Sequence, residues 1–591
     1  MPLEKTKTKI VCTLTGKHAD EKFIKQMIKN GMNVVRLNFS HMNIKQANRI
    51  IEIIAEVRAE INEPISIMLD TKGPEVRLYG FDKEVEIKKD DLITIQSYDG
   101  EDIESIESEK ERYFYTNLPD VGKLTKEGGK ILLMDGFVEG RIIDKENDRI
   151  IVEIKNNALL RPKAHLSIPK LDYPLPFLAP KDVEDIKYAV ERDLDYLALS
   201  FVRSTEDISK VKSLVREINP ESQIKIISKI ENRKALDNLN EIIRYSDGIM
   251  VARGDLGVEL DLQDVPVVQK DIIEKCYLSG KPVITATQML ESMVDNPIPT
   301  RAEASDVANA GYDMTSAVML SSETAIGKYP LKVVETMKNI LLKVENAIEY
   351  ENVLRKRKEI FQSRDLTSII SYNAISTSYQ SNSAALIVFT KTGYSARMIS
   401  KLRPKLPIYA FTFKRKVFNQ LALNWGVFPF MLKEKDDFEA MLSDALDLCL
   451  KENLVNRGDL AVIIAGLPLG GSGRTNNIRI ESLGKSRIPG KLIHEGDVTA
   501  PVVHIYNEND ISEKKLTGKI LFLKNFKKEY IAYLRYVSGI VMENDDYEND
   551  LQLIGMAYNI PVFLNAYAVM DMIEEGTVVE INSKKQLLIE I

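Results

Sequence analysis

The predicted fold is decided by two stretches, Ile226-Ile-Ser-Lys-Ile-Glu-Asn232 and Gly248-Ile-Met-Val-Ala-Arg-Gly-Asp-Leu-Gly257. Each begins as a short apolar run, which is typical of a buried strand, and ends abruptly in charged residues and glycine. Lys229 and Glu231 are two residues apart and so point to one face of an extended chain, and Asp255 follows the next strand beside two glycines. Because barrel enzymes hold their chemistry at strand ends, the pattern predicts two carboxylates and an ammonium in one small space.

The chemistry of this predicted cluster favours a divalent metal. Two nearby carboxylates without a histidine suit Mg²⁺, which keeps several waters and takes its other ligands from a phosphate or carboxylate substrate. Lys229 would lie against the same anion. The residues also fit a plainer alternative, in which Lys229 and Glu231 form a strand-end ion pair and Gly254 to Gly257 form an ordinary turn.

Composition narrows the class of protein. The chain has 591 residues, of which 44% are apolar and 28% are charged, so it is long enough for about four domains with large cores. A net charge of −7 argues against a nucleic-acid partner. The N-terminal segment is polar, and no apolar run is long enough to span a membrane, so we expect a cytoplasmic protein without a membrane partner.

Cysteine and histidine usage excludes several kinds of site. The three cysteines are far apart, which predicts buried inert thiols instead of a disulfide framework or a zinc site. The five histidines are scattered, which argues against histidine-bound metals and Ser-His-Asp catalysis. The histidines are His18, His41, His165, His494 and His504.

Eight apolar runs of strand length alternate with helical patterns, and this alternation predicts an α/β (β/α)₈ TIM barrel. The expected strands are at residues 9–14, 32–37, 65–70, 195–201, 224–229, 247–252, 282–286 and 317–321. The expected helices are Asp20–Asn30, Asn43–Ile61, Pro180–Arg192, Glu206–Ile218, Val265–Leu278 and Pro330–Tyr350.

Four domains are expected, and the barrel comprises residues 1–72 and 171–350. Residues 73–170 read as short alternating strands, such as Lys88–Ile95 and Arg149–Ile154, and predict an inserted all-β domain that could act as a lid. A smaller α/β domain follows at 351–485, with strands near Ala385–Phe389, Ile408–Phe411 and Leu460–Ala465. An extra αβ-like domain at 486–591 has strands near Lys519–Leu523, Ser538–Met542 and Pro561–Leu564.

Two further barrel strands also end in polar residues. Val34-Val-Arg-Leu-Asn-Phe-Ser-His41 closes the second strand, and Ile67-Met-Leu-Asp-Thr-Lys-Gly-Pro-Glu-Val-Arg77 closes the third. Their neutral oxygens and single carboxylate fit a large monovalent cation better than Mg²⁺. These ligands are Asn38, Ser40, Asp70 and Thr71. Arg36 and Arg77 can bind phosphate oxygens with paired donors, although a surface or capping role suits each residue taken alone.

Hydroxyls and glycines mark three more candidate anion sites. We expect Thr285 and Thr287 to face together at the end of the seventh strand, near a helix that starts within Pro299–Asp306. In the smaller domain, Phe389-Thr-Lys-Thr-Gly-Tyr-Ser-Ala396 and Gly466-Leu-Pro-Leu-Gly-Gly-Ser-Gly-Arg-Thr-Asn476 are loops of the kind that hold phosphate. A lone glycine-rich loop is weak evidence, but two in one domain make a second anion site a fair hypothesis.

Six motifs, taken in order, closely resemble the pyruvate kinase family over roughly residues 7–485. They are Arg36-Leu-Asn-Phe-Ser-His41, Leu69-Asp-Thr-Lys-Gly-Pro-Glu75, Ile227-Ser-Lys-Ile-Glu-Asn232, Met250-Val-Ala-Arg-Gly-Asp-Leu-Gly257, Ala286-Thr-Gln-Met-Leu-Glu-Ser292 and Pro299-Thr-Arg-Ala-Glu303. The resemblance implies phosphoryl transfer from phosphoenolpyruvate to ADP, which gives ATP and an enolate that is then protonated to pyruvate. Both substrates are anions, so cations in a closed site are the expected means of bringing them together.

The resemblance also implies a role for each matching residue. Glu231 and Asp255 would hold Mg²⁺ (or Mn²⁺), and Lys229 would stabilise the phosphoryl group in flight. Further phosphoenolpyruvate contacts would come from Arg36, Gly254, Asp255 and Thr287. The K⁺ ligands would be Asn38, Ser40, Asp70 and Thr71, with Arg77, Asn38 and His41 on the nucleotide side. Glu75 is the family's marker of K⁺ dependence, although Leu78 stands where K⁺-dependent members usually have threonine.

The remaining domains resemble family features as well. Residues 384–480 resemble the family's effector domain, which implies a sugar-phosphate or nucleotide effector, and a homotetramer is the expected assembly. The candidate effector residues are Thr390, Thr392, Gly393, Ser395, Gly471, Ser472, Gly473 and Arg474. Residues 486–591 resemble a phosphohistidine domain of phosphoenolpyruvate-utilising enzymes, but Asp550 occupies the histidine position, which predicts a structural or interface role.

Two alternatives to phosphoryl transfer explain fewer of these residues. A Mg²⁺-dependent lyase on a related pyruvate-binding barrel would need no ADP and gives no reason for the lid domain. A catalytically silent sugar-phosphate sensor would not need Lys229, Glu231, Asp255 and Thr287, all of which are intact. The residues alone leave the proton donor to the enolate open among Thr287, a water chain and another hydroxyl.

Overall fold

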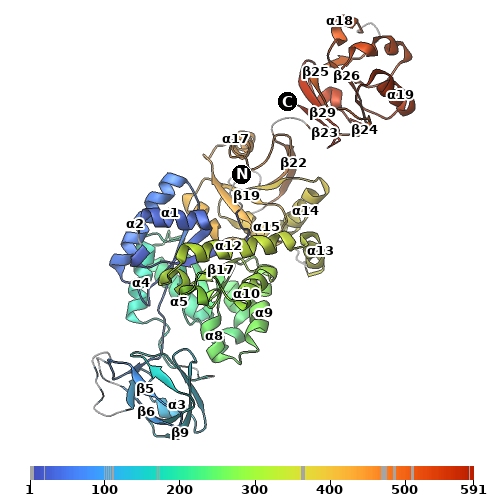
Figure 1. Ribbon diagram of the computed structural model, residues 1–591. Helices are drawn as coiled ribbons and strands as arrows, with labels where there is room; N and C mark the ends of the chain where they lie inside the picture. Colours follow the sequence, from blue (N-terminus) through green and yellow to red (C-terminus); the bar gives the residue numbers. More distant parts are fainter. Residues whose placement is uncertain are drawn as a thin grey trace. The chain divides into compact units, whose positions relative to one another are not determined.

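The computed structural model describes residues 5–590, apart from residues 19, 99, 101, 102, 104, 105, 107, 109–111, 170, 172, 361–365, 467–474, 484–486, 508–510 and 585. The chain forms two compact units, and some of their helices and strands are labelled in Figure 1. The first unit contains Leu3–Ser368 and Phe389–Met431, and the second contains Ile369–Val388 and Leu432–Ile591. No helix in the described part of the chain is both long enough and apolar enough to cross a bilayer.

Eight parallel strands close into a barrel in the first unit, which confirms the predicted α/β (β/α)₈ fold class. The strands are β1 (Lys9–Thr13), β2 (Met32–Asn38), β3 (Ser66–Asp70), β13 (Tyr196–Leu199), β14 (Lys225–Ile230), β15 (Gly248–Ala252), β16 (Val283–Ala286) and β17 (Ala317–Leu320). The order around the barrel is β1-β17-β16-β15-β14-β13-β3-β2, so all eight carboxyl ends share one rim.

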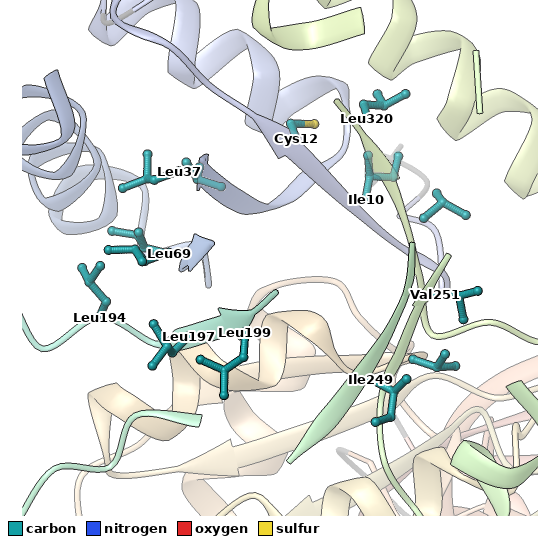
Figure 2. Close-up of a cluster of buried hydrophobic side chains, with 14 of the residues drawn as sticks. Ile10, Cys12, Leu37, Leu69, Leu194, Leu197, Leu199, Ile249, Val251 and Leu320 are labelled. Carbon is teal, nitrogen blue, oxygen red and sulfur yellow. The ribbon is translucent and has the colours of Figure 1, made fainter. Parts of the chain in front are cut away.

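Side-chain alternation along each strand builds two apolar layers. In β1, Ile10 and Cys12 pack outward against the helices, whereas Val11 points into the barrel. Figure 2 shows part of the outer layer, to which several strands contribute. Both layers are almost free of solvent, so the strands hold the rim in a fixed geometry.

Helices follow the barrel strands as predicted, and side-chain caps fix several of their starts. They include α1 (Glu21–Asn30), α2 (Ile44–Ile61), α4 (Pro180–Glu191), α5 (Thr205–Ile218), α9 (Val265–Leu278), α10 (Arg301–Tyr312) and α12 (Pro330–Ala347). Asn43 caps α2 and Thr300 caps α10, each through a reciprocal capping box. The helix predicted to continue to Tyr350 ends at Ala347 because Ile348 takes an extended conformation.

The insertion after β3 is almost entirely β, as predicted. Its elements are β4 (Leu78–Tyr79), β5 (Val85–Ile87), β6 (Leu92–Ser97), β7 (Tyr113–Thr116), α3 (Val121–Leu124), β8 (Lys130–Leu133), β9 (Val138–Lys145), β10 (Arg149–Ile154), β11 (Ala158–Leu160) and β12 (Leu166–Ser167). The single strand predicted at Lys88–Ile95 is wrong. Asp90 has a φ of 68° and the Asp91 carboxylate accepts from the Lys88 amide, so a turn separates β5 from β6.

The smaller α/β elements are also present in the described residues. In the first unit, β19 (Ile408–Thr412) pairs in parallel with β20 (Val427–Met431), and α15 spans Tyr394–Ser400. In the second unit, β18 (Ala385–Phe389) pairs in parallel with β21 (Leu460–Ala465), which pairs antiparallel with β22 (Asn477–Ser482). The second unit also contains α17 (Phe438–Lys451).

The last part of the second unit is an eight-stranded mixed sheet in the order β23-β30-β29-β25-β26-β27-β28-β24. Its strands are β23 (Arg487–Pro489), β24 (Lys491–His494), β25 (Val498–Ile505), β26 (Ile520–Leu523), β27 (Gly539–Met542), β28 (Val562–Leu564), β29 (Val578–Asn582) and β30 (Leu587–Glu590). Asp550 lies in the first turn of α19 (Glu548–Tyr558). The predicted domain limits, and the predicted role of this last domain, stay predictions.

Candidate active site

Lys229 is held between two buried carboxylates at the rim of the barrel. Its ammonium lies 2.8 Å from the Glu231 carboxylate and 3.3 Å from the Asp70 carboxylate, and it donates to the Ser200 hydroxyl at 2.7 Å. Burial alone would lower the pKa of Lys229, but Asp70 and Glu231 hold it above its ordinary value. The lysine is therefore a fixed cation, presented by β14 where the strand ends.

Arg36 adds a second cation from β2. Its Nε lies 2.7 Å from the second oxygen of Asp70, and its Nη1 donates to the Thr13 hydroxyl at 3.1 Å. Burial would raise the pKa of Asp70, but Lys229 and Arg36 together lower it, so this carboxylate stays ionised. Asp70 thus orients two cations toward the same end of the barrel.

Asp255 lies in the first turn of α8 (Arg253–Glu259), the short helix that follows β15. Burial raises the pKa of Asp255 and also that of Glu231, and in each case Lys229 opposes the shift. Asp255 and Glu231 line one cavity, so the predicted cluster of Lys229, Glu231 and Asp255 is brought together. With Arg36 and Asp70 included, three carboxylates face two cations, and this excess of negative charge favours an added cation.

Thr287 follows β16 and takes a φ of 67°, which is unusual for a β-branched residue. Its hydroxyl oxygen accepts from the Gly254 amide at 2.9 Å, so the threonine lies beside the start of α8. The expectation that Thr285 and Thr287 face together is wrong. Thr285 is fully buried and donates to the Thr315 hydroxyl, because the strand ends at Ala286 and its two-residue alternation stops there.

Arg253 is a site residue that the sequence reasoning missed. Its guanidinium binds both carboxylate oxygens of Asp306, at 2.7 and 2.9 Å, and donates to the Thr287 carbonyl at 2.6 Å. Through these contacts it joins α10, the loop after β16 and the start of α8. The sequence signal for Arg253 is only its position two residues before Asp255, because its partner Asp306 is far away in the sequence.

The four residues predicted to bind K⁺ are gathered at the ends of β2 and β3. Asn38 and Asp70 are neighbours in the register of these strands, and the Asn38 side-chain oxygen accepts from the Ser40 amide at 3.2 Å. The Thr71 hydroxyl accepts from the Ser200 amide at 3.2 Å. The Asp70 carboxylate already bonds to Arg36 and Lys229, and binding of K⁺ by these four residues stays a prediction.

Of the three residues predicted for the nucleotide side, Arg77 and His41 show no bond to Lys229 or its carboxylates in the described part of the chain. Arg77 forks onto the Glu75 carboxylate at 2.6 and 2.8 Å and donates to the Lys163 carbonyl at 2.7 Å. His41 is exposed just beyond β2. The third residue, Asn38, is the register neighbour of Asp70, which lies 3.3 Å from Lys229.

Of the predicted effector residues, the structure describes the first loop only. Thr390 and Gly393 lie between β18 and α15, where Gly393 has a φ of 77° and the Thr392 carbonyl accepts from Arg397 at 3.2 Å. Ser395 lies in the first turn of α15. The second set, Gly471, Ser472, Gly473 and Arg474, lies outside the described residues.

A cavity of about 280 Å³ adjoins the two carboxylates. Glu231 and Asp255 line it from the barrel, and Val76, His165 and Leu166 are among the residues that line it from the insertion. Within the described residues, no group of three or more His, Cys, Asp and Glu side chains could hold a metal by itself. A metal held by Glu231 and Asp255 would therefore take its remaining ligands from substrate and water.

A closed barrel with buried cations and carboxylates at its carboxyl rim, beside a cavity, defines an enzyme of the TIM-barrel class that acts on anionic substrates. Residues 5–334 match the family description "Pyruvate kinase, barrel domain", and residues 368–481 match "Pyruvate kinase, alpha/beta domain". The chain therefore belongs to the pyruvate kinase family of phosphotransferases.

Individual relatives agree with this assignment. The chain is 36% identical over 588 residues to a pyruvate kinase from Staphylococcus saprophyticus and 35% identical over 589 residues to one from Staphylococcus aureus, and each match covers 99% of both chains. A crystal structure of a pyruvate kinase from Cryptosporidium parvum has a TM-score of 0.75 and 33% identity, and the match covers 81% of this chain and 97% of that one. Similarity thus extends over the whole chain, including the part beyond residue 481.

Proposed function

We propose that this enzyme transfers the phosphoryl group of phosphoenolpyruvate to ADP, giving pyruvate and ATP, with Mg²⁺ (or Mn²⁺) and K⁺ as cofactors, as a step of glycolysis in the cytoplasm. The observation that carries the proposal is the position of Lys229, 2.8 Å from Glu231 and 3.3 Å from Asp70 in a buried rim that also holds Arg36 and Asp255. Membership of the family supports the same reaction.

The residues present fit the proposed divalent cation. Glu231 and Asp255 are buried carboxylates whose pKa values are raised by burial, so an added cation would stabilise their ionised forms. Mg²⁺ is commonly held by one or two carboxylates together with substrate phosphate. When bound, it would offset charge on the transferring phosphoryl group and on the enolate oxygen. The other proposed cation, K⁺, would be held by Asn38, Ser40, Asp70 and Thr71, and Glu75 would mark its requirement.

The chain's own residues would act by positioning and by electrostatic stabilisation. Lys229 and Arg36 would bind oxygens of the phosphoryl group as it leaves the enol oxygen of phosphoenolpyruvate and joins the terminal phosphate of ADP. Thr287 and the Gly254 amide would orient the carboxylate of phosphoenolpyruvate. The remaining enolate takes a proton at carbon, from Thr287, a water chain or another hydroxyl, and becomes pyruvate.

Regulation belongs to the same proposal. A sugar phosphate or nucleotide would bind the loop that contains Thr390–Ser395, in a homotetramer. The positive φ of Gly393 gives the first loop a conformation that brings backbone amides close to a phosphate.

The direct test is a coupled assay for pyruvate. Purified protein is mixed with phosphoenolpyruvate, ADP and Mg²⁺, with and without K⁺ and candidate sugar phosphates, and pyruvate and ATP are both measured. We expect equal amounts of the two products, faster with K⁺ than with Na⁺. Pyruvate formed without ADP would instead indicate a lyase, and the absence of any product would indicate a sensor.

A further inference from the structure

The cavity beside Glu231 and Asp255 has a basic side chain on its opposite wall. His165 lies at the base of the insertion, immediately before β12, and its backbone bridges to that of Arg77. Among the residues that line this cavity, it is the sole histidine. Its ring is mostly buried, with 17% of the side chain exposed, so it belongs to the cavity wall and not to the outer surface.

Asp135 fixes the orientation of the His165 ring. One Asp135 oxygen lies 3.0 Å from Nδ1 of His165, and the His165 carbonyl accepts from the Met134 amide at 2.9 Å. An ionised carboxylate can only accept, so Nδ1 carries the hydrogen of this bond, and Nε2 is the nitrogen left for another partner. Asp135 itself is largely exposed, at 68%, which separates its orienting role from the cavity.

The charges around His165 favour its cationic form. Burial lowers the pKa of His165, but Asp135, Asp255 and Glu75 together raise it above its ordinary value. The cavity thus has carboxylates on the barrel wall and a paired imidazole on the insertion wall. An anion in this cavity would therefore lie between the carboxylates and the imidazole, both of which line it.

Three other basic residues line the cavity, and each already has a partner. Arg203 donates to the Tyr173 and Leu175 carbonyls, Arg233 pairs with Asp237, and Lys234 has interactions of its own. Neither Lys229 nor Arg36 is among the residues that line this cavity, and both instead bond to Asp70. In the proposed reaction, Lys229 and Arg36 would bind phosphoenolpyruvate. The other anionic substrate, ADP, would then need a hydrogen-bond donor from the cavity wall.

We propose that His165, oriented by Asp135, is a binding residue for the nucleotide, and that its Nε2–H donates to a phosphate oxygen of the nucleoside diphosphate. This inference rests on the proposed function, since it assigns one of the two substrates of that reaction to the cavity wall formed by the insertion. A merely structural histidine would stabilise the turn at Asp135 and leave the affinity for nucleotide unchanged.

The test compares His165→Gln with Asp135→Asn and with Glu139→Gln as a matched control. Glu139 forms an exposed ion pair with Lys130 in the same insertion, at 2.9 Å, so its variant removes a carboxylate that does not face the cavity. Steady-state kinetics give KM for ADP and for phosphoenolpyruvate, calorimetric titration with ADP and Mg²⁺ gives Kd, and thermal melting reports folding.

For His165→Gln we expect KM and Kd for ADP to rise about tenfold, as for a lost hydrogen bond to a charged group, with KM for phosphoenolpyruvate unchanged. Asp135→Asn should raise both ADP constants about threefold, and Glu139→Gln should change neither. A His165→Lys variant should recover most of the affinity, since it restores a cation.

Unchanged ADP constants in His165→Gln would overturn the inference, as would an equal rise in both KM values. The two proposals are separable, because the calorimetric titration does not depend on turnover. If the parent protein makes no pyruvate but binds ADP and loses that binding in His165→Gln, the proposed function fails and the assignment of His165 stands.

Discussion

The pKa of a buried lysine is shifted in opposite directions at the two ends of the barrel. At the carboxyl rim, Lys229 lies between Asp70 and Glu231, and these carboxylates raise its pKa. At the amino end, Lys9 of β1 donates to the Val427 carbonyl at 2.8 Å and lies over the ring of Phe428, and burial lowers its pKa to about 7. Burial is similar at the two positions, so the neighbouring carboxylates decide the charge.

The carboxylate nearest Lys9 is already bound by the backbone. Glu345 of α12 accepts from the amides of Lys7 and Thr8, at 2.9 and 2.7 Å, and so closes the start of β1 against the helix. At the rim, by contrast, Glu231 and Asp255 face a cavity. Glu231 also accepts from a backbone amide, that of Phe201, so the cavity makes the difference. A buried charge enclosed by protein is structural, whereas one that faces a cavity is available to a ligand.

The largest expected effect comes from removing the rim lysine. Lys229→Met should lower kcat by about 10³-fold, because a preorganised cation is lost from the phosphoryl group in the transition state. KM for phosphoenolpyruvate should change much less. Pyruvate release measures both, and thermal melting checks that the barrel still folds. A kcat within tenfold of the parent would make Lys229 a structural residue like Lys9.

An intermediate effect is expected from Arg253, which supports the rim without touching the cluster of charges. Arg253→Lys keeps the charge but cannot reproduce the paired bonds to Asp306 and the bond to the Thr287 carbonyl. We expect kcat/KM for phosphoenolpyruvate to fall about 30-fold through misplaced Thr287 and Gly254. Asp306→Asn should show the same trend more weakly. Equal activity of parent and Arg253→Lys would show that the loop is held by other contacts.

The smallest effect concerns Lys9 and pH. Between pH 7 and 10.5 the unfolded lysine binds a proton that the folded one has lost, so the folded state gains stability as pH rises, and below pH 7 this gain is absent. From pH 7 to 9 the contribution to the free energy of unfolding is about 2 kcal/mol. Urea unfolding should show a smaller rise in Lys9→Met than in the parent.

A matched control for this experiment is the exposed Lys22 of α1. Lys22→Met should keep the parent's pH dependence, because the Lys22 side chain is exposed and the substitution leaves the environment of Lys9 unchanged. If Lys9→Met and the parent rise in parallel, the buried ammonium of Lys9 keeps its proton and the contrast between the two ends of the barrel is lost.

Much of the fold could be predicted from the sequence because short apolar segments, followed directly by charged residues, mark the strands. The run that ends at Glu231 corresponds to β14, and the pattern from Val265 to Leu278 corresponds to α9 without error. Such patterns are local, so one sequence carries them. The turn at Asp90 was missed because its left-handed backbone leaves only a weak trace in residue type.

The candidate site was predictable where neighbours in sequence share a strand end, and not where distant segments meet. Lys229 and Glu231 are two residues apart, so their proximity followed from strand geometry. Arg253 and Asp306 are 53 residues apart, and His165 reaches the cavity only because the insertion folds beside the barrel. No periodic pattern records such long-range contacts.

The loop after β16 has a strained backbone, which limits the substitutions that this chain can accept there. Thr287 and Gln288 are consecutive non-glycine residues with φ of 67° and 52°, and a β-branched residue in that region loses about 1–3 kcal/mol. Glycine at position 287 would relieve the strain but would delete the hydroxyl that meets the Gly254 amide. Selection for heat resistance alone would therefore favour glycine at position 287, at the expense of the hydroxyl that holds the Gly254 amide.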